Sequence, residues 1–139
     1  MNILVIDGQG GKIGSMVVSL LKKATPKQEV IAVGTNSIAT SAMLKAGADK
    51  GASGENPVIV NSKKADVIAG PLGIVIADSM LGEVTPKMAE AIGSSNAQKL
   101  LIPTNNCNNI VLGTESLSIN ELVIIAVDKI SKICNQDKI

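Results

Sequence analysis

The run Ile3-Leu4-Val5-Ile6-Asp7-Gly8-Gln9-Gly10-Gly11-Lys12-Ile13-Gly14-Ser15 decides the fold. Its four leading apolar residues predict a buried strand, its glycines a tight turn, and the part from Lys12 onward the start of a helix. Such a unit directs unpaired backbone N–H groups and the positive end of the helix dipole toward one point. The sequence therefore predicts an anion site, typically for phosphate, at this turn.

The glycine spacing refines this prediction. Gly8, Gly11 and Gly14 form a G-x-x-G-x-x-G pattern, in which the first glycine permits the turn and the second permits close approach of a ligand. The third lets the helix pack closely on the strand. The strict G-x-G-x-x-G form fails, because Ile13 stands where it needs a glycine. The spaced form resembles the opening of extended short-chain dehydrogenases and dihydrodipicolinate reductases. A turn that needs glycine only for its backbone angles is the alternative interpretation.

Composition excludes several classes of function. The 139 residues are 45% hydrophobic with a net charge of +1, and they include no aromatic residue and no histidine. Aromatic side chains on which bases could stack are therefore absent. The sequence also has no basic run, so we expect no nucleic-acid partner. Tyrosine-dependent dehydrogenases, histidine triads and histidine metal sites are excluded, and we expect no metal. No apolar run reaches the roughly 18 residues that span a membrane, and two cysteines predict reduced thiols in the cytoplasm.

Hydrophobic periodicity predicts the order of elements. After the first strand we expect helix 12–23, strand 29–33, helix 38–46 capped by Asn36 or Ser37, short strand 49–52, helix 53–64 capped by Ser53, strand 65–70, helix 85–92, strand 99–103, short strand 110–112, and a final helix from Ser118 or Asn120. Residues 58–60 also fit a strand, and segment 74–81 fits either a buried helix or a packed loop. The alternation predicts an α/β, three-layer Rossmann-like domain over residues 1–134, followed by a polar tail at 135–139. Its open, mostly parallel sheet would have about five strands, with helices on both faces.

The ligand site of such a sheet lies beyond the carboxyl ends of its strands. The second of these ends offers Thr35 and Asn36 where an NAD site usually carries an acid for the ribose. The ligand is therefore not NAD, or it is phosphorylated at that place, or it is smaller than a dinucleotide. The expected ligand-binding residues are Gly8, Gln9, Gly10, Gly11, Lys12, Ile13, Gly14, Thr35, Asn36, Ser37, Ser53, Gly54, Gly70, Pro71, Thr104 and Asn105.

Individual side chains allow more than one role. Lys12 either holds a phosphate as a point charge or is a solvated residue of the first helical turn. Asp7 orients either a ligand hydroxyl or the glycine turn itself. Cys107 is a candidate nucleophile, although no histidine is present to activate its thiol. The carboxylates that could act as general acid or base are Glu55, Asp78 and Glu83.

The strand ends also resemble those of methylglyoxal synthase-type phosphate-binding domains. The residues that carry this resemblance are Lys12, Gly34-Thr35-Asn36, Ser53-Gly54 and Thr104-Asn105, with Glu55 at the place of the family's catalytic acid. The catalytic histidine of that family has no counterpart in this sequence. The resemblance therefore implies a phosphate pocket without the lyase chemistry.

Over its full length the sequence resembles a family of short bacterial proteins, a domain of unknown function, that begin with the run Asp-Gly-Gln-Gly-Gly. That resemblance implies no known activity. We expect a cytoplasmic homodimer that binds a phosphate-bearing small molecule, with a nucleotide or NAD(P)-type dinucleotide as the expected ligand. The alternatives are an enzyme that acts on a small phosphorylated metabolite and an interaction protein that has kept the fold and lost the ligand.

Overall fold

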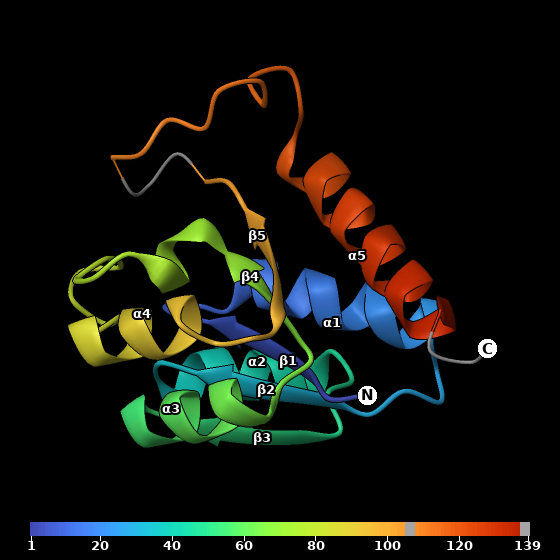
Figure 1. The fold of residues 1–139 in the computed structure, drawn as a ribbon, viewed down its shortest axis with the longest axis horizontal. Helices are drawn as coiled ribbons and strands as arrows, with labels where there is room; N and C mark the ends of the chain where they lie inside the picture. The colour runs from blue at the N-terminus through green and yellow to red at the C-terminus, as the bar shows by residue number, and fades with distance from the viewer. Residues whose placement is uncertain (105–107, 137–139) are drawn as a thin grey trace.

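A parallel sheet forms the centre of the molecule. The computed structural model describes residues 1–104 and 108–136. Its strands are β1 (Ile3–Asp7), β2 (Val30–Gly34), β3 (Lys50–Ser53), β4 (Val67–Pro71) and β5 (Gln98–Ile102). They are arranged in the order β3-β2-β1-β4-β5, and every pair is parallel (Figure 1). The expected α/β fold with a five-stranded sheet is confirmed.

The central strand β1 is buried along its whole length. Leu4 aligns with Ile31 of β2 on one side and with Ile68 of β4 on the other. The chain builds outward from β1 through β2 and β3, then returns to add β4 and β5 at the opposite edge. The order therefore reverses between β1 and β4, and in open α/β sheets the crevice at such a switch point is where ligands bind.

Helices cover both faces of the sheet, which gives three layers. Side chains alternate across a strand, so Ile3 and Val5 face one core while Leu4 and Ile6 face the other. The first core is covered by α1 (Lys12–Ala24), α2 (Ser37–Lys45) and α5 (Ile119–Gln136), and the second by α3 (Glu55–Lys64) and α4 (Pro86–Gly93). Aliphatic side chains, with Met43 and Met88, fill both cores without any aromatic residue.

The structure decides three local features that the sequence left open or placed differently. Residues 58–60 belong to α3, whose N-cap is Gly54 with φ 107° rather than Ser53. Segment 74–81 begins in the last two residues of the short 3₁₀ helix η1 (Leu72–Val75) and continues as a loop, in which Ile74 is buried and Leu81 is 97% exposed. Ser118 caps α5 by accepting the Glu121 N–H at 3.1 Å.

The expected strand at 110–112 was wrong. The stretch from 108 to 118 runs through turns and open chain, and Ile110 and Leu112 are 85% and 84% exposed. Figure 1 shows why, since this stretch arches away from the sheet and, in the described part of the chain, no strand lies beside it to pair with its backbone. Within the described residues, no helix is both long and apolar enough to cross a membrane.

Candidate functional site

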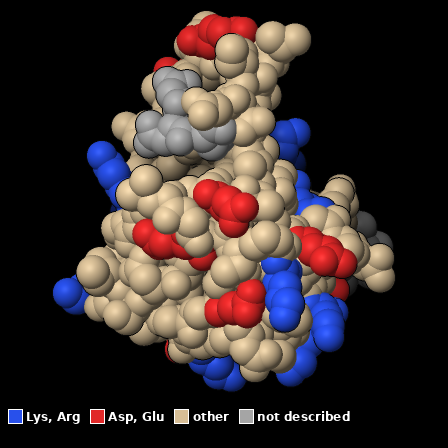
Figure 2. Space-filling model, turned by 90° about the vertical axis from the view of Figure 1, so that its left-hand side faces the viewer, with Lys and Arg blue, Asp and Glu red and all other residues tan. Residues whose placement is uncertain are grey.

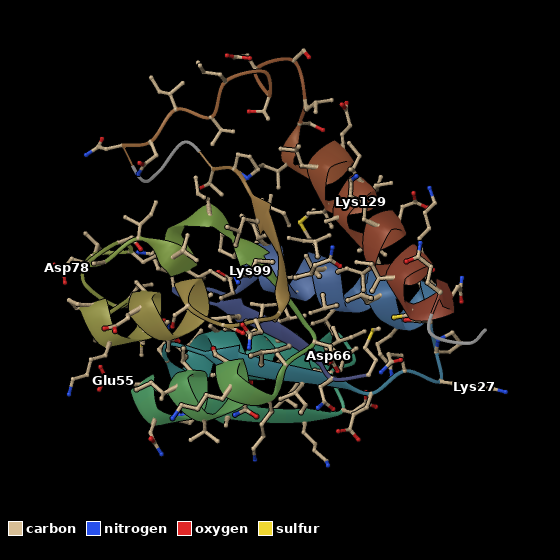
Figure 3. The ribbon with its side chains drawn as sticks, in the orientation of Figure 1. Lys27, Glu55, Asp66, Asp78, Lys99 and Lys129 are labelled. Atoms are coloured by element: carbon tan, nitrogen blue, oxygen red, sulfur yellow. The ribbon has the colours of Figure 1, made fainter. Side chains whose placement is uncertain are left out.

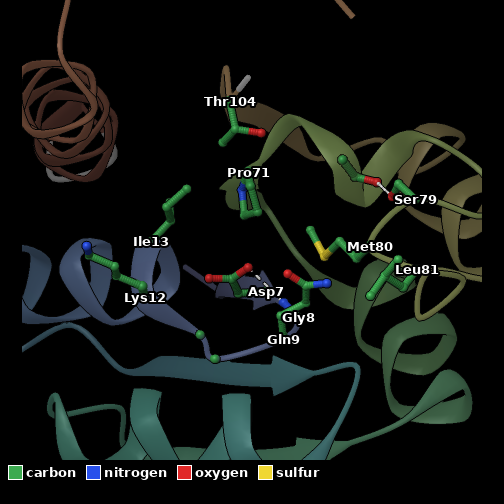
Figure 4. Close-up of a pocket in the computed structure, with 13 residues that line it drawn as sticks. Asp7, Gly8, Gln9, Lys12, Ile13, Pro71, Ser79, Met80, Leu81 and Thr104 are labelled. Carbon is green, nitrogen blue, oxygen red and sulfur yellow. Dashed lines mark hydrogen bonds between the residues drawn. The ribbon is translucent and has the colours of Figure 1, made fainter. Parts of the chain in front are cut away.

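A cavity of about 380 Å³ lies over the glycine turn, between the carboxyl ends of β1 and β4 (Figure 4). Eight of the expected site residues line this cavity. The backbone from Gly8 to Ile13 forms its base, and Pro71 and Thr104 lie opposite that base. Four further lining residues come from the segment after β4, and these are Gly73, Ser79, Met80 and Leu81. The switch point of the sheet therefore carries the cavity, as the topology requires.

The glycines of the turn differ in what they contact. Gly11 has φ 69°, and a Cβ placed there would lie 2.9 Å from both the Cα and the carbonyl oxygen of Ala39. The second glycine of the pattern thus allows α2 to approach the turn, and Gly11 also lines the cavity. Gly14 has the expected role, because its Cβ position lies 2.8 Å from the Asp7 Cβ, where helix and strand pack together. Gly10 has open space around it, with nothing within 4 Å of its Cβ position.

Asp7 holds the turn together from inside. Its Oδ1 accepts the Gly8 N–H and its Oδ2 accepts the Gly14 N–H, both at 2.7 Å, and the residue is only 5% exposed. Burial raises the pKa of this carboxyl above its ordinary value, and the negative charge of Glu83 adds to that rise. The hydrogen bonds from Gly14 and Gly8 oppose it. Asp7 therefore orients the glycine turn, which was one of its two expected roles.

Two backbone donors remain available at the start of α1. Within the described residues, the N–H groups of Gly10 and Lys12 have no partner, since the turn bonds use Gly11, Gly14 and Ser15. The first turn of this 13-residue helix contains no acidic residue. The Lys12 side chain is exposed, and Figure 4 shows its amino group turned away from Asp7. The N-terminal end of α1 therefore presents two unpartnered backbone donors to the cavity, the kind of group that binds anions.

Glu83 lies beside the glycine turn. The sequence named it only as a possible general acid or base and did not place it there. Its Oε1 accepts the Gln9 N–H at 2.8 Å, the Thr35 hydroxyl at 2.7 Å and the Asn36 Nδ2 at 2.7 Å. Burial acts to raise the pKa of Glu83, but these three hydrogen bonds outweigh it and hold the pKa below its ordinary value. No pattern joins Glu83 to Thr35 in the sequence, because 48 residues separate them. Met80 lies nine residues beyond the end of β4 at Pro71 and after η1, so no strand-end pattern marks it in the sequence.

The other expected site residues lie away from the cavity. Glu55 accepts the Thr85 hydroxyl at 2.6 Å and so joins α3 to the N-cap of α4, while Asp78 lies at the outer edge of its turn (Figure 3). Neither candidate acid lines the cavity. The remaining residues on the β2 and β3 side, also outside the lining, are Thr35, Asn36, Ser37, Ser53 and Gly54. Gly70 packs against the Ile6 carbonyl, and Asn105 and Cys107 lie outside the described residues.

Comparisons with known proteins identify a family. The chain is similar in structure to a dodecameric FMN-dependent Ubix-like decarboxylase from Escherichia coli O157:H7, with a TM-score of 0.48 and 16% sequence identity. That similarity covers 91% of this chain and 75% of the other. No curated protein matches the sequence. The family model described as Domain of unknown function (DUF3842) matches residues 2–135. As the full-length resemblance predicted, the chain belongs to the DUF3842 family.

Proposed function

We propose that this protein binds a phosphate-bearing small molecule, such as a nucleotide, in the cavity over the glycine turn. The observation that carries the proposal is the pair of unpartnered N–H groups, on Gly10 and Lys12, at the start of α1 among the described residues. Backbone donors at a helix N-terminus bind phosphate oxygens, and the Lys12 ammonium adds a positive charge beside them. Among the described lining residues, Lys12 is the one cation.

The geometry favours binding over catalysis. Asp7 is the one carboxylate among the described lining residues, and both of its oxygens already accept backbone N–H groups. A general acid or base needs an oxygen that can exchange a proton with the ligand. In an interaction protein that has lost its ligand, other side chains would fill the space over the glycine turn. Here that space is open at Gly10, whose Cβ position has nothing within 4 Å.

Thermal unfolding in the presence of candidate ligands tests the proposal. We expect inorganic phosphate, ribose 5-phosphate or AMP to raise the unfolding temperature, since a ligand at 100 times its Kd stabilises the folded state by about 2.7 kcal/mol. In Lys12→Gln, the Kd should rise about threefold to tenfold because one exposed charge is lost, and the difference should shrink as salt is added.

Lys63→Gln is the matched control, because Lys63 is an exposed lysine in the last turn of α3 and does not line the cavity. It should leave the Kd unchanged. Absence of a shift with every phosphate compound, in a folded sample, would refute the proposed function. Equal effects of the two lysine variants would remove Lys12 from the site.

We further propose the homodimer that the sequence predicted. Ile110, Leu112 and Ile124 are exposed aliphatic side chains, and exposed apolar surface of this kind is typical of contacts between copies of a chain. Light scattering should give about twice the 14.2 kDa mass of one chain, and Ile124→Lys should lower that mass. A mass of one chain at every concentration would refute the dimer.

A further inference from the structure

We propose that Glu83 closes the β2 side of the glycine turn and thereby restricts the ligand to a compact phosphate monoester, excluding a dinucleotide. This inference rests on the proposed function, which it narrows. A dinucleotide laid across a sheet of this kind extends from the glycine turn to the end of the second strand. The cavity extends the other way, toward β4, so the two sides of the turn can be considered separately.

The donors on the β2 side are already used within the protein. The Gln9 N–H, the Thr35 hydroxyl and the Asn36 amide all donate to the Glu83 Oε1 at 2.7–2.8 Å. Asn36 Nδ2 also donates to the Gln9 carbonyl at 3.0 Å, and Asn36 Oδ1 caps α2 by accepting the Ala39 N–H. A ribose hydroxyl that entered here would have to displace a carboxylate held by three hydrogen bonds. The Glu83 carboxylate therefore takes the place of a ligand group at the end of β2.

Shape separates the two sides in the same way. A Cβ placed on Gly8 would lie 2.6 Å from the Met80 Sδ and 2.7 Å from the Thr35 Oγ1, so the backbone there is covered. A Cβ placed on Gly10, two residues along, would meet nothing within 4 Å. The open part of the turn is thus the part next to the unpartnered N–H groups. A ligand can reach Gly10 and Lys12 without moving Met80 or Glu83.

Charge acts in the same direction. Glu83 is half-buried and carries a negative charge that its three donors stabilise. A second phosphate group or a 2′-phosphate placed beside Thr35 would meet this charge at short range and be repelled. At the other end of the turn, Lys12 and the start of α1 attract one phosphate group. The pattern fits a ligand with a single phosphoryl group.

The turn that supplies Glu83 has a defined shape. Asp78, Met80 and Leu81 have φ values of 65°, 57° and 59°, and Gly82 has φ 88°. Left-handed conformations of residues other than glycine are unfavourable and persist where surrounding contacts fix them. Several hydrogen bonds fix this turn, among them those from the Asp78 N–H to the Val84 carbonyl at 2.7 Å and from Ser79 Oγ to the Gly73 carbonyl. Glu83 is thereby presented to β2 by a structured turn.

Calorimetric titration with ribose 5-phosphate and NADH tests the inference on the full chain. The unmodified protein should bind ribose 5-phosphate at least about tenfold more tightly than NADH. In Glu83→Ala, NADH affinity should rise about tenfold or more, while the affinity for ribose 5-phosphate changes less than about threefold. Glu83→Gln keeps the side-chain length and removes the charge, so its NADH affinity should fall between the other two. Glu90→Ala, at an exposed acid on α4, is the matched control and should change neither affinity.

Two results would overturn the inference while leaving phosphate binding intact. One is NADH binding to the unmodified protein as tightly as ribose 5-phosphate. The other is an unchanged NADH affinity in both Glu83 variants. If Glu83→Ala fails to fold, Glu83→Gln and the unmodified protein still give both comparisons. Failure of both ligands to bind any variant would overturn this inference, and the proposed function would fall with it only if inorganic phosphate and AMP also gave no shift.

Discussion

The Gly70→Ala variant is expected to lose about 3 kcal/mol of unfolding free energy, because among the glycines its Cβ position has the closest contact. A Cβ on Gly70 of β4 would collide with the carbonyl oxygen of Ile6 on β1, and it would also lie 3.1 Å from the Ile74 Cδ1. The carbonyl belongs to the backbone of the central strand, so it has no rotamer by which to give way. Denaturant unfolding followed by far-ultraviolet circular dichroism measures the loss.

Gly10→Ala is the matched control for this experiment. Its Cβ would meet nothing within 4 Å, so its stability should stay within about 0.5 kcal/mol of the unmodified protein. If Gly70→Ala were equally stable, the close approach of β1 and β4 described above would be wrong.

The Asp7→Ala variant should lose about 2–4 kcal/mol, because the N–H groups of Gly8 and Gly14 would both lose a buried acceptor. The loss of unfolding free energy can be measured in the same denaturant experiment. Asp7→Asn should lose less, since its amide oxygen can accept one of the two donors while its NH₂ group faces the other. Stability equal to that of the unmodified protein in both variants would show that the turn does not depend on this side chain.

The same residue gives a pH dependence whose sign is fixed. The folded-state pKa of Asp7 is raised, so its favourable contribution is fully present below about pH 4 and is lost as the pH rises through the folded pKa. Asparagine does not titrate in this range. The stability difference between the unmodified protein and Asp7→Asn should therefore be larger at pH 4 than at pH 8. A difference that grows with pH would contradict the direction of the shift.

Much of the fold could be predicted from the sequence because local patterns determine it. The four apolar residues before Gly8 predict a buried strand, and β1 is buried throughout. Asn36, one of two expected caps, and Thr85 are the N-caps of α2 and α4. The glycine turn and its place at the sheet's carboxyl edge follow from the same patterns. The cavity contains eight of the expected residues for that reason, namely Gly8, Gln9, Gly10, Gly11, Lys12, Ile13, Pro71 and Thr104.

Contacts between distant segments could not be predicted. The role of Gly11 depends on the backbone of Ala39, and that of Glu83 depends on Thr35, and neither pair is related by any sequence period. Segment 110–112 was misjudged for a related reason, since apolar β-branched residues form a strand only where a neighbouring strand accepts their backbone hydrogen bonds. Local preference cannot supply that neighbour.

The position of β1 has a consequence for how the protein is made. This strand precedes every other element of the sequence, yet it lies in the middle of the sheet and needs β4 to cover its second edge. At a translation rate of about 5–20 residues per second, Pro71 is added roughly 3–13 s after Asp7. During that interval the nascent chain carries a strand with four successive apolar residues, Ile3 to Ile6, and with at most one partner, β2. Because β4 forms the second edge contact of β1, this edge of β1 has to be shielded until β4 is synthesised.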